Sequence, residues 1–428
     1  MLNKTLLAKD VKKIIEGFAN AENPHELLQF SLENVNLLGD LKSIIALDEY
    51  DRAINPHNMN EMVDKHNNYI VPYFSSHKLY FIDYNILRMM ISNEVHDVNI
   101  DFSVMFDSNF ASYIHKFVRK IPMKSVSNDF DVLIGDMIRN GINFDYMFYI
   151  FENYKNIRLL EDPCNSEEYK AIVENLKSLE LFKSIDIEGY KKNGHVKYQI
   201  SEKQANDLAV QFAHDFYFHN HSRSYLEKLF NMKNMILLAL IGIVRIKYQD
   251  KGGADNKMKD YFEFVHENIG INLERETLLA YEYFKNSKEV IIFKKIYRGM
   301  DTSNLVGLLD NIAWDFMVPR IMENAMTYMG EGDYILPYFL SFDKGLIRML
   351  KLFEIKGILI DKERLKCYPF MEKGYADTFN NEKLIKILQS QFSVEKAEAR
   401  KDKCDNTKMN FTERFDCELE KLTKTLLV

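Results

Sequence analysis

The sequence predicts a helix-rich α/β protein whose core holds a few parallel strands and is split along the chain. Three observations lead to this fold class. Runs rich in β-branched and aromatic residues are confined to about 78–110 and 333–361. Helical patterns follow these runs directly, as in the strand–helix units of parallel sheets. Elsewhere apolar residues recur at three- and four-residue spacing, and only 8 prolines and 17 glycines interrupt the 428 residues.

The elements follow in chain order. Residues 1–77 predict helices, with a break at Asn23-Pro24. LYFID (79–83) and VNIDFSVMFD (98–107) predict strands, and a helix follows each. Residues 129–160 and most of 161–302 predict helices, with KGGADNK (251–257) as the clearest break. A helix over 303–329 with a kink at Pro319 then leads to the strands YILPYFLSFD (334–343) and KGILID (356–361).

Composition narrows the functional class. A net charge of −7 argues against a protein that coats nucleic acid through a basic surface, so any nucleic-acid path is expected to be a local basic groove. The apolar run Met235–Val244 has about half of the ~20 residues that a membrane span needs, so we expect a buried helix and no membrane. The start, MLNKTLLAKDVKKII, has no signal-peptide pattern. The four cysteines form no CxxC pair, which favours free thiols in the cytoplasm.

Three short motifs place acidic residues where α/β proteins bind ligands. FDSN (106–109) and SFDK (341–344) each stand at the end of a predicted strand and the start of a helix. AWD (313–315) lies inside a predicted helix, where an acidic residue among apolar neighbours needs a partner if it is buried. Carboxylates at the C-terminal ends of parallel strands point into the crevice where such sheets bind ligands.

The order of these motifs resembles the PIN-domain nucleases. In that family the first strand ends in a D-[ST]-N-like motif, a later helix carries an Asp, and a following strand ends in T-x-D-K or a similar motif. FDSN, AWD and SFDK follow this order. The family also has an acidic residue on a helix between the first and third acids, and Glu152 in FENY fits best, with Glu161 a weaker substitute. The resemblance implies a three-layer core with a parallel sheet.

The resemblance also implies chemistry. Hydrolysis of a phosphodiester needs an activated water and neutralisation of charge, which one or two Mg²⁺ or Mn²⁺ ions supply through oxygen ligands. The expected catalytic and metal-binding residues are Asp107, Glu152, Asp315 and Asp343. Ser108 or Asn109 is expected to hydrogen-bond Asp107, and Lys344 to meet a phosphate. Basic residues of the inserted helices, such as Arg223, Lys228 and Lys233, are candidates for holding the strand.

The implied organisation is a nuclease core interrupted by a large helical insertion. We expect an N-terminal helical region (1–77), a split core (78–160 and 303–362), a helical insertion (161–302) and a charged C-terminal extension (363–428). The implied function is an endoribonuclease of the toxin or antiviral-defence type. RNA is preferred over DNA only because most relatives of this kind cut RNA. A protein partner or self-association through the helical surface is also expected.

Several alternatives stay open. Asp107 and Asp343 also fit the N-cap of a helix, and Glu152 an ordinary solvated position. Asp83-Tyr84-Asn85 repeats the strand, D-x-N, helix pattern and rivals Asp107 as the first acid. His214, His219 and His221 do not share one helix face and lack a recognisable zinc partner, which favours a surface role. The chain can also be a helical interaction protein whose core is catalytically inactive.

Overall fold

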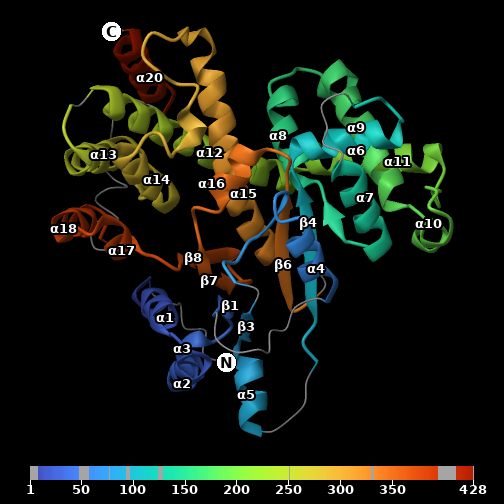
Figure 1. Ribbon diagram of the computed structural model, residues 1–428, viewed down its shortest axis with the longest axis horizontal. Coiled ribbons are helices and arrows are strands. Elements are labelled where there is room, and N and C mark those ends of the chain that lie inside the picture. The colour runs from blue at the N-terminus through green and yellow to red at the C-terminus, as the bar shows by residue number, and fades with distance from the viewer. Residues whose placement is uncertain are drawn as a thin grey trace. The chain divides into compact units, whose positions relative to one another are not determined.

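The computed structural model describes residues 8–47, 57–76, 78–92, 97–123, 129–249, 251–328, 332–393 and 411–427 (Figure 1). The chain divides into two compact units. The first, which we call the strand-bearing unit, comprises Ile14–Lys228 and Pro319–Phe370. The second, the helical unit, comprises Met1–Lys13, Leu229–Val318 and Met371–Val428. The helix-rich α/β class expected from the sequence is confirmed, because long helices surround two small sheets.

The first sheet contains the parallel strands that the sequence predicts. Its order is β2-β6-β4-β5, with β2 at Ile70–Pro72, β6 at Tyr334–Leu340, β4 at Ile100–Phe106 and β5 at Phe144–Asp145. β4 pairs parallel with both β5 and β6, and lies beside β6 in Figure 1. The register runs from Ile100 opposite Tyr334 to Phe106 opposite Leu340. Two segments more than 220 residues apart in the chain therefore end at the same edge of one sheet.

The second sheet was not expected. Its order is β3-β1-β7-β8, with β3 at Leu79–Ile82, β1 at Lys42–Ala46, β7 at Ile355–Asp361 and β8 at Lys366–Met371. The sequence predicts the strands β3 and β7, but their assignment to one parallel core is wrong. β1 lies between them and pairs antiparallel with both. This unpredicted strand therefore draws β3 and β7 into a sheet of their own.

Residues 1–77, predicted as a helical region, also contain strands. Helices α1 (Ala8–Asn20), α2 (Pro24–Glu33), α3 (Val35–Leu38) and α4 (His57–Lys65) are present, but so are β1 and β2. Gly39 ends α3 with a φ of 49°, a conformation that suits glycine. The segment that follows has two adjacent isoleucines, both fully buried, which suits a strand covered on both faces.

Helices of the strand-bearing unit follow the predicted positions. α8 and α6 pack against β4, and α9 packs against α6 and α11. The ring of Phe106 stacks on that of Phe144 with centroids 4.6 Å apart, which fixes the end of β4 against β5. The bounds are α5 Tyr84–Ser92, α6 Ser108–Val118, α7 Asp129–Asn140, α8 Met147–Ile157, η1 Pro163–Asn165, α9 Glu167–Lys183, α10 Ile187–Asn193, α11 Glu202–Phe218 and α16 Lys344–Leu350.

The helical unit receives parts of two long helices, α12 (Asn220–Gln249) and α15 (Leu305–Tyr328), of which the latter contains Pro319. By length and composition α12 can cross a membrane, but 72% of its apolar window is buried inside the protein, as in the core helix of a soluble protein. The other elements are α13 Ala254–Asn268, α14 Glu274–Lys285, η2 Ile291–Phe293, η3 Thr302–Asn304, α17 Tyr375–Phe379, α18 Glu382–Gln391 and α20 Phe411–Leu427.

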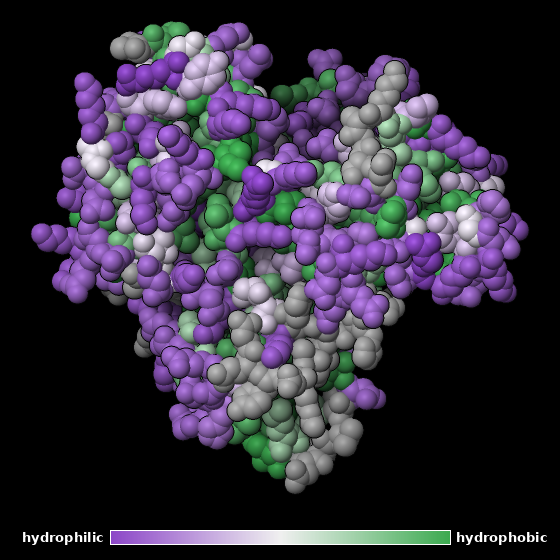
Figure 2. All heavy atoms as spheres, viewed as in Figure 1, coloured by the Kyte–Doolittle hydropathy of each residue, from purple (hydrophilic) through white to green (hydrophobic). Residues whose placement is uncertain are grey.

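One face of the molecule is mostly hydrophilic (Figure 2). Figure 2 shows one face of the molecule, on which hydrophilic residues dominate and hydrophobic residues form smaller groups between them. The described cysteines, Cys164, Cys367 and Cys417, are free thiols, and Cys404 lies outside the described residues. The predicted charged tail contains β8 and three helices in its described part, and α20 buries Leu422 and Leu426.

Candidate active site at the ends of β4 and β6

The pairing of β4 with β6 brings two of the sequence motifs together. The backbone N–H of Asp107 donates to the Leu340 carbonyl over 3.0 Å, so the parallel ladder continues one residue beyond both strands. Ser341 and Asp343 come directly after β6. The FDSN and SFDK motifs therefore meet at the C-terminal edge of the sheet, where α/β proteins bind ligands.

Asp107 lies at the centre of this edge. Its Oδ2 accepts a hydrogen bond of 2.8 Å from the Ser341 hydroxyl. Burial raises its pKa from 3.8 to about 6, and the charges of Glu152 and Asp343 add to the rise, against the Ser341 hydroxyl and the nearby Asn109 N–H, which lower it. Asp107 has no ion-pair partner in the described part of the chain. It is thus a carboxylate held in a site that disfavours its own negative charge.

Glu152 approaches Asp107 from the helix that follows β5. It lies on α8, with its side chain about one-third exposed, and Lys155 is 3.3 Å from its Oε1. Its charge is near enough to raise the pKa of Asp107. Of the predicted acids, Glu152 and Asp343 therefore lie near enough for their charges to act on Asp107.

Asp343 has a second task, because it caps helix α16. Its Oδ1 accepts from the backbone N–H groups of Gly345 and Leu346 at 2.7 and 3.1 Å. The Ser341 hydroxyl accepts from the Asp343 N–H at 3.0 Å while it donates to Asp107. The helix-cap interpretation is thus right for Asp343. Asp107 also occupies the N-cap position of α6, and the Asn109 N–H of that helix lowers its pKa, but its side chain makes no cap hydrogen bond.

The charges that raise the pKa of Asp107 are those of Glu152 and Asp343, and the fourth predicted acid, Asp315, lies in the other unit. It is half-buried in α15 and belongs to the helical unit, beside the buried Trp314 and Phe316. Among the described residues no three His, Cys, Asp or Glu side chains gather closely enough to hold a metal ion. Of the expected quartet, Glu152 and Asp343 thus lie within electrostatic reach of Asp107, and the described residues form no preassembled set of metal ligands.

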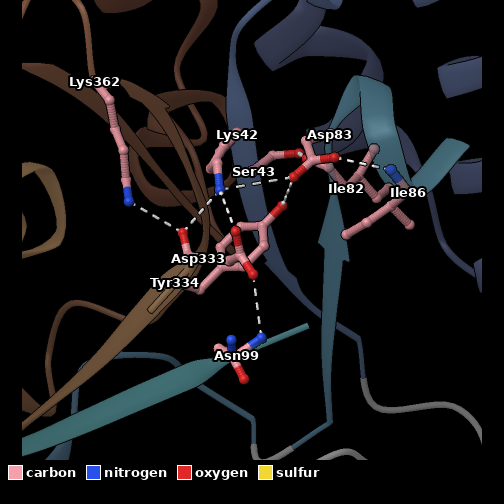
Figure 3. Close-up of polar contacts among 9 residues, drawn as sticks. All are labelled: Lys42, Ser43, Ile82, Asp83, Ile86, Asn99, Asp333, Tyr334 and Lys362. Carbon is pink, nitrogen blue, oxygen red and sulfur yellow. Dashed lines mark hydrogen bonds and ion pairs between the residues drawn. The ribbon is translucent and has the colours of Figure 1, made fainter. Parts of the chain in front are cut away.

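Both carboxylate oxygens of Asp83, the alternative first acid, have polar contacts (Figure 3). It follows β3 of the second sheet and is buried. Its Oδ2 accepts from the Tyr334 hydroxyl at 2.9 Å and lies 3.9 Å from the Lys42 ammonium, and its Oδ1 accepts from the Ile86 N–H at 2.9 Å. Lys42 also binds Asp333. These contacts give Asp83 a structural role.

The predicted supporting residues are only partly placed as expected. In the described part of the chain the side chains of Ser108 and Asn109 form no hydrogen bond with Asp107, and Ser341 supplies the hydroxyl instead. Sequence reasoning missed this residue, although its place at the end of β6, two residues before Asp343, is a signal for it. Lys344 is exposed at the first turn of α16, as a phosphate ligand has to be.

One candidate for holding a nucleic-acid strand is excluded. Lys233 is buried in the helical unit, where it pairs with Asp310 at 2.5 Å and lies over the Phe230 ring. Arg223 and Lys228, by contrast, are exposed on the strand-bearing unit. The two residues differ from Lys233 because α12 becomes buried as it enters the apolar core of the helical unit.

The donors at this edge fit a hard divalent cation. Carboxylate oxygens are the ligands that Mg²⁺ prefers, and it commonly binds through one or two carboxylates while it keeps several waters. Asp107 and Glu152 supply such oxygens, and the pKa of Asp107 is raised by burial and then by nearby negative charge, both of which a bound cation would offset. Among the described residues no third metal ligand is positioned to complete a rigid binding site.

The fold and this edge define a helix-rich α/β protein with an acidic cluster at the ends of two adjacent parallel strands. Comparison with known proteins finds no matching family model, no similar curated protein and no similar solved structure. The interpretation of the cluster therefore depends on its own chemistry.

Proposed function

We propose that this protein is a Mg²⁺- or Mn²⁺-dependent nuclease of the PIN-like kind that hydrolyses phosphodiester bonds in RNA. The observation that carries the proposal is the place of Asp107 and Asp343 after two adjacent parallel strands, with the pKa of Asp107 raised to about 6 by burial and, to a smaller extent, by the charges of Glu152 and Asp343. Burial and like charge of this kind are typical of functional sites. The parallel strands β4, β5 and β6 support the likeness to PIN domains, while the second sheet and the place of Asp315 depart from it.

The residues of the cluster have separable tasks. Asp107 and Glu152 hold the ion, and Ser341 orients Asp107 through its hydrogen bond. Asp343 adds negative charge and fixes the start of α16, which presents Lys344 to a substrate phosphate. When bound, the ion polarises the phosphate and lowers the pKa of a water. Asp107 has to be ionised to act as a ligand, so ion binding weakens as the pH falls through about 6.

Purified protein should cleave single-stranded RNA with Mn²⁺ or Mg²⁺, and EDTA should stop cleavage. Asp343→Asn removes the charge and keeps a side chain that caps helices well. We expect it to lower the cleavage rate at least about tenfold with an unchanged thermal midpoint. Asp343→Ala loses the cap as well, and should cost about 1 kcal/mol of stability. Wild-type cleavage by Asp343→Asn contradicts a role for Asp343 in the reaction.

A second candidate is a helical interaction protein with an inactive core that binds a protein partner or itself. The observation that favours it is the cap made by Asp343, together with the lack of three gathered donors among the described residues. Calorimetric titration with Mn²⁺ separates the two candidates, because the inactive protein binds no divalent ion. If the nuclease proposal holds, the protein acts in the cytoplasm as a toxin or in antiviral defence. Comparing the growth of cells that express wild type with that of cells that express Asp343→Asn tests this.

A further inference from the structure

A cavity of about 250 Å³ lies inside the strand-bearing unit, lined in part by two elements that lead to acids of the cluster. Its walls come from β4, α8, α11, α12 and α15. Two elements connect it to the cluster. Met105 on β4 lines the cavity two residues before Asp107, which follows the end of that strand. Phe151 on α8 lines it directly before Glu152.

The inner wall of the cavity is apolar and aromatic. Met105 and Phe151 are buried there. The ring of Phe151 lies 5.6 Å from that of Phe216 and 5.9 Å from that of Tyr225, measured between centroids. Tyr225 in turn lies 5.5 Å from Tyr328, which is 48% exposed. A wall of rings and thioethers suits a flat aromatic guest, because every base has a π-face that stacks on such side chains.

The mouth of the cavity is polar and carries positive charge. His221, Ser224 and Lys228, on the first turns of α12, line it and are exposed. Lys228 has no ion-pair partner among the residues that the structure describes. A lysine at the mouth is placed to meet a phosphate attached to a guest whose ring lies inside. The cavity therefore combines a site for a ring with a site for an anion, in a protein of net charge −7.

We propose that this cavity binds one unpaired base of the RNA strand whose backbone crosses the acidic cluster. This inference rests on the proposed nuclease function and gives it a substrate class, single-stranded rather than fully paired RNA. The same base-and-phosphate chemistry is present in a free mononucleotide. The strand is favoured because the cavity shares β4 and α8 with the cluster, so one backbone can reach both sites.

The test compares a short single-stranded RNA with a series of RNAs of the same sequence, each of which carries one abasic nucleotide at a different position. Binding is measured by fluorescence anisotropy in EDTA, which prevents cleavage. At one position the missing base should weaken binding to wild type about tenfold. Ala325→Phe, which fills the cavity, and Ser224→Trp, at its exposed mouth, should remove this penalty. Ser224→Trp keeps the test valid if the buried substitution does not fold.

Lys228→Ala should weaken binding of intact and abasic RNA alike, whereas the matched substitution Lys203→Ala, at an exposed position of α11, should not. The inference is overturned if wild type does not bind RNA, if no abasic position weakens binding, or if the penalty persists in both cavity variants. It is also overturned if a mononucleotide competes as well as the intact RNA. Cleavage in Mn²⁺ is scored separately. Bound but uncut RNA contradicts the nuclease alone, and cut RNA without an abasic penalty contradicts the cavity alone.

Discussion

Two stretches of this chain have the same local pattern and opposite surroundings. Asp83-Tyr84-Asn85 and Asp107-Ser108-Asn109 each follow a strand and begin a helix. Asp83 receives a tyrosine hydroxyl, a backbone N–H and the charge of a lysine. Asp107 accepts a hydrogen bond from the hydroxyl of Ser341, and its burial, together with the charges of Glu152 and Asp343, raises its pKa to about 6.

The difference separates structural from functional acids better than the motif does. A buried carboxylate with its oxygens bonded and a lysine nearby has little to offer a ligand, and its loss leaves those partners unsatisfied. A carboxylate among like charges is destabilised until a cation arrives. We therefore expect substitutions at Asp83 to damage the fold and substitutions at Asp107 to damage the activity.

The largest expected effect is on catalysis by Asp107. Asp107→Asn removes the central ligand charge and should lower RNA cleavage by about 10²–10³-fold, because a bound ion contributes several kcal/mol to the transition state. Single-turnover cleavage with saturating Mn²⁺ measures this loss. Asp83→Asn is the matched control and should cleave at the wild-type rate once it is folded. Equal losses in the two variants contradict the division of roles.

The second largest expected effect is a loss of stability when Asp83 is replaced. Asp83→Ala leaves the Tyr334 hydroxyl and the Ile86 N–H without their acceptor, and should lower the free energy of unfolding by about 2–3 kcal/mol. Urea denaturation measures the change. Asp207→Ala, at an exposed position of α11, should stay within about 0.5 kcal/mol of wild type. A wild-type midpoint for Asp83→Ala refutes the structural role of Asp83.

The sequence predicted those acids of the site that directly follow a strand. FDSN and SFDK were recognisable because a strand with a continuous apolar pattern precedes each acid, and the parallel pairing of β4 with β6 then brings them to one edge. The second sheet was not predictable because β1 is short, and its apolar sequence continues the pattern of the helices before it. The positions of Asp315 and Ser341 depend on tertiary structure that local spacing does not encode. α15 places Asp315 in the helical unit, and the hydroxyl of Ser341, directly after β6, donates to Asp107.

The smallest expected effect is a gain in stability at Asp107. Its pKa is raised in the folded protein, so the protonated form is favoured by folding. This stabilisation is complete below the unfolded value of 3.8 and is lost as the pH rises through about 6. Asp107→Asn should therefore be about 1 kcal/mol more stable than wild type at about pH 8, after allowance for solvent screening, and equal to it at about pH 4. Chemical denaturation at both pH values checks this, and a less stable variant at the higher pH contradicts it.

Titration of the protein with Mn²⁺ in a calorimeter tests the central claim most directly, namely that Asp107 is the centre of a cation site. Wild type should bind Mn²⁺ at about pH 7.5 and lose affinity about tenfold or more at about pH 5, because protonation of Asp107 competes with the ion. Asp107→Asn should not bind at either pH, while Asp83→Asn should bind as wild type does. Mn²⁺ affinity that is the same in wild type and Asp107→Asn, or independent of pH across this range, contradicts the assignment of this site.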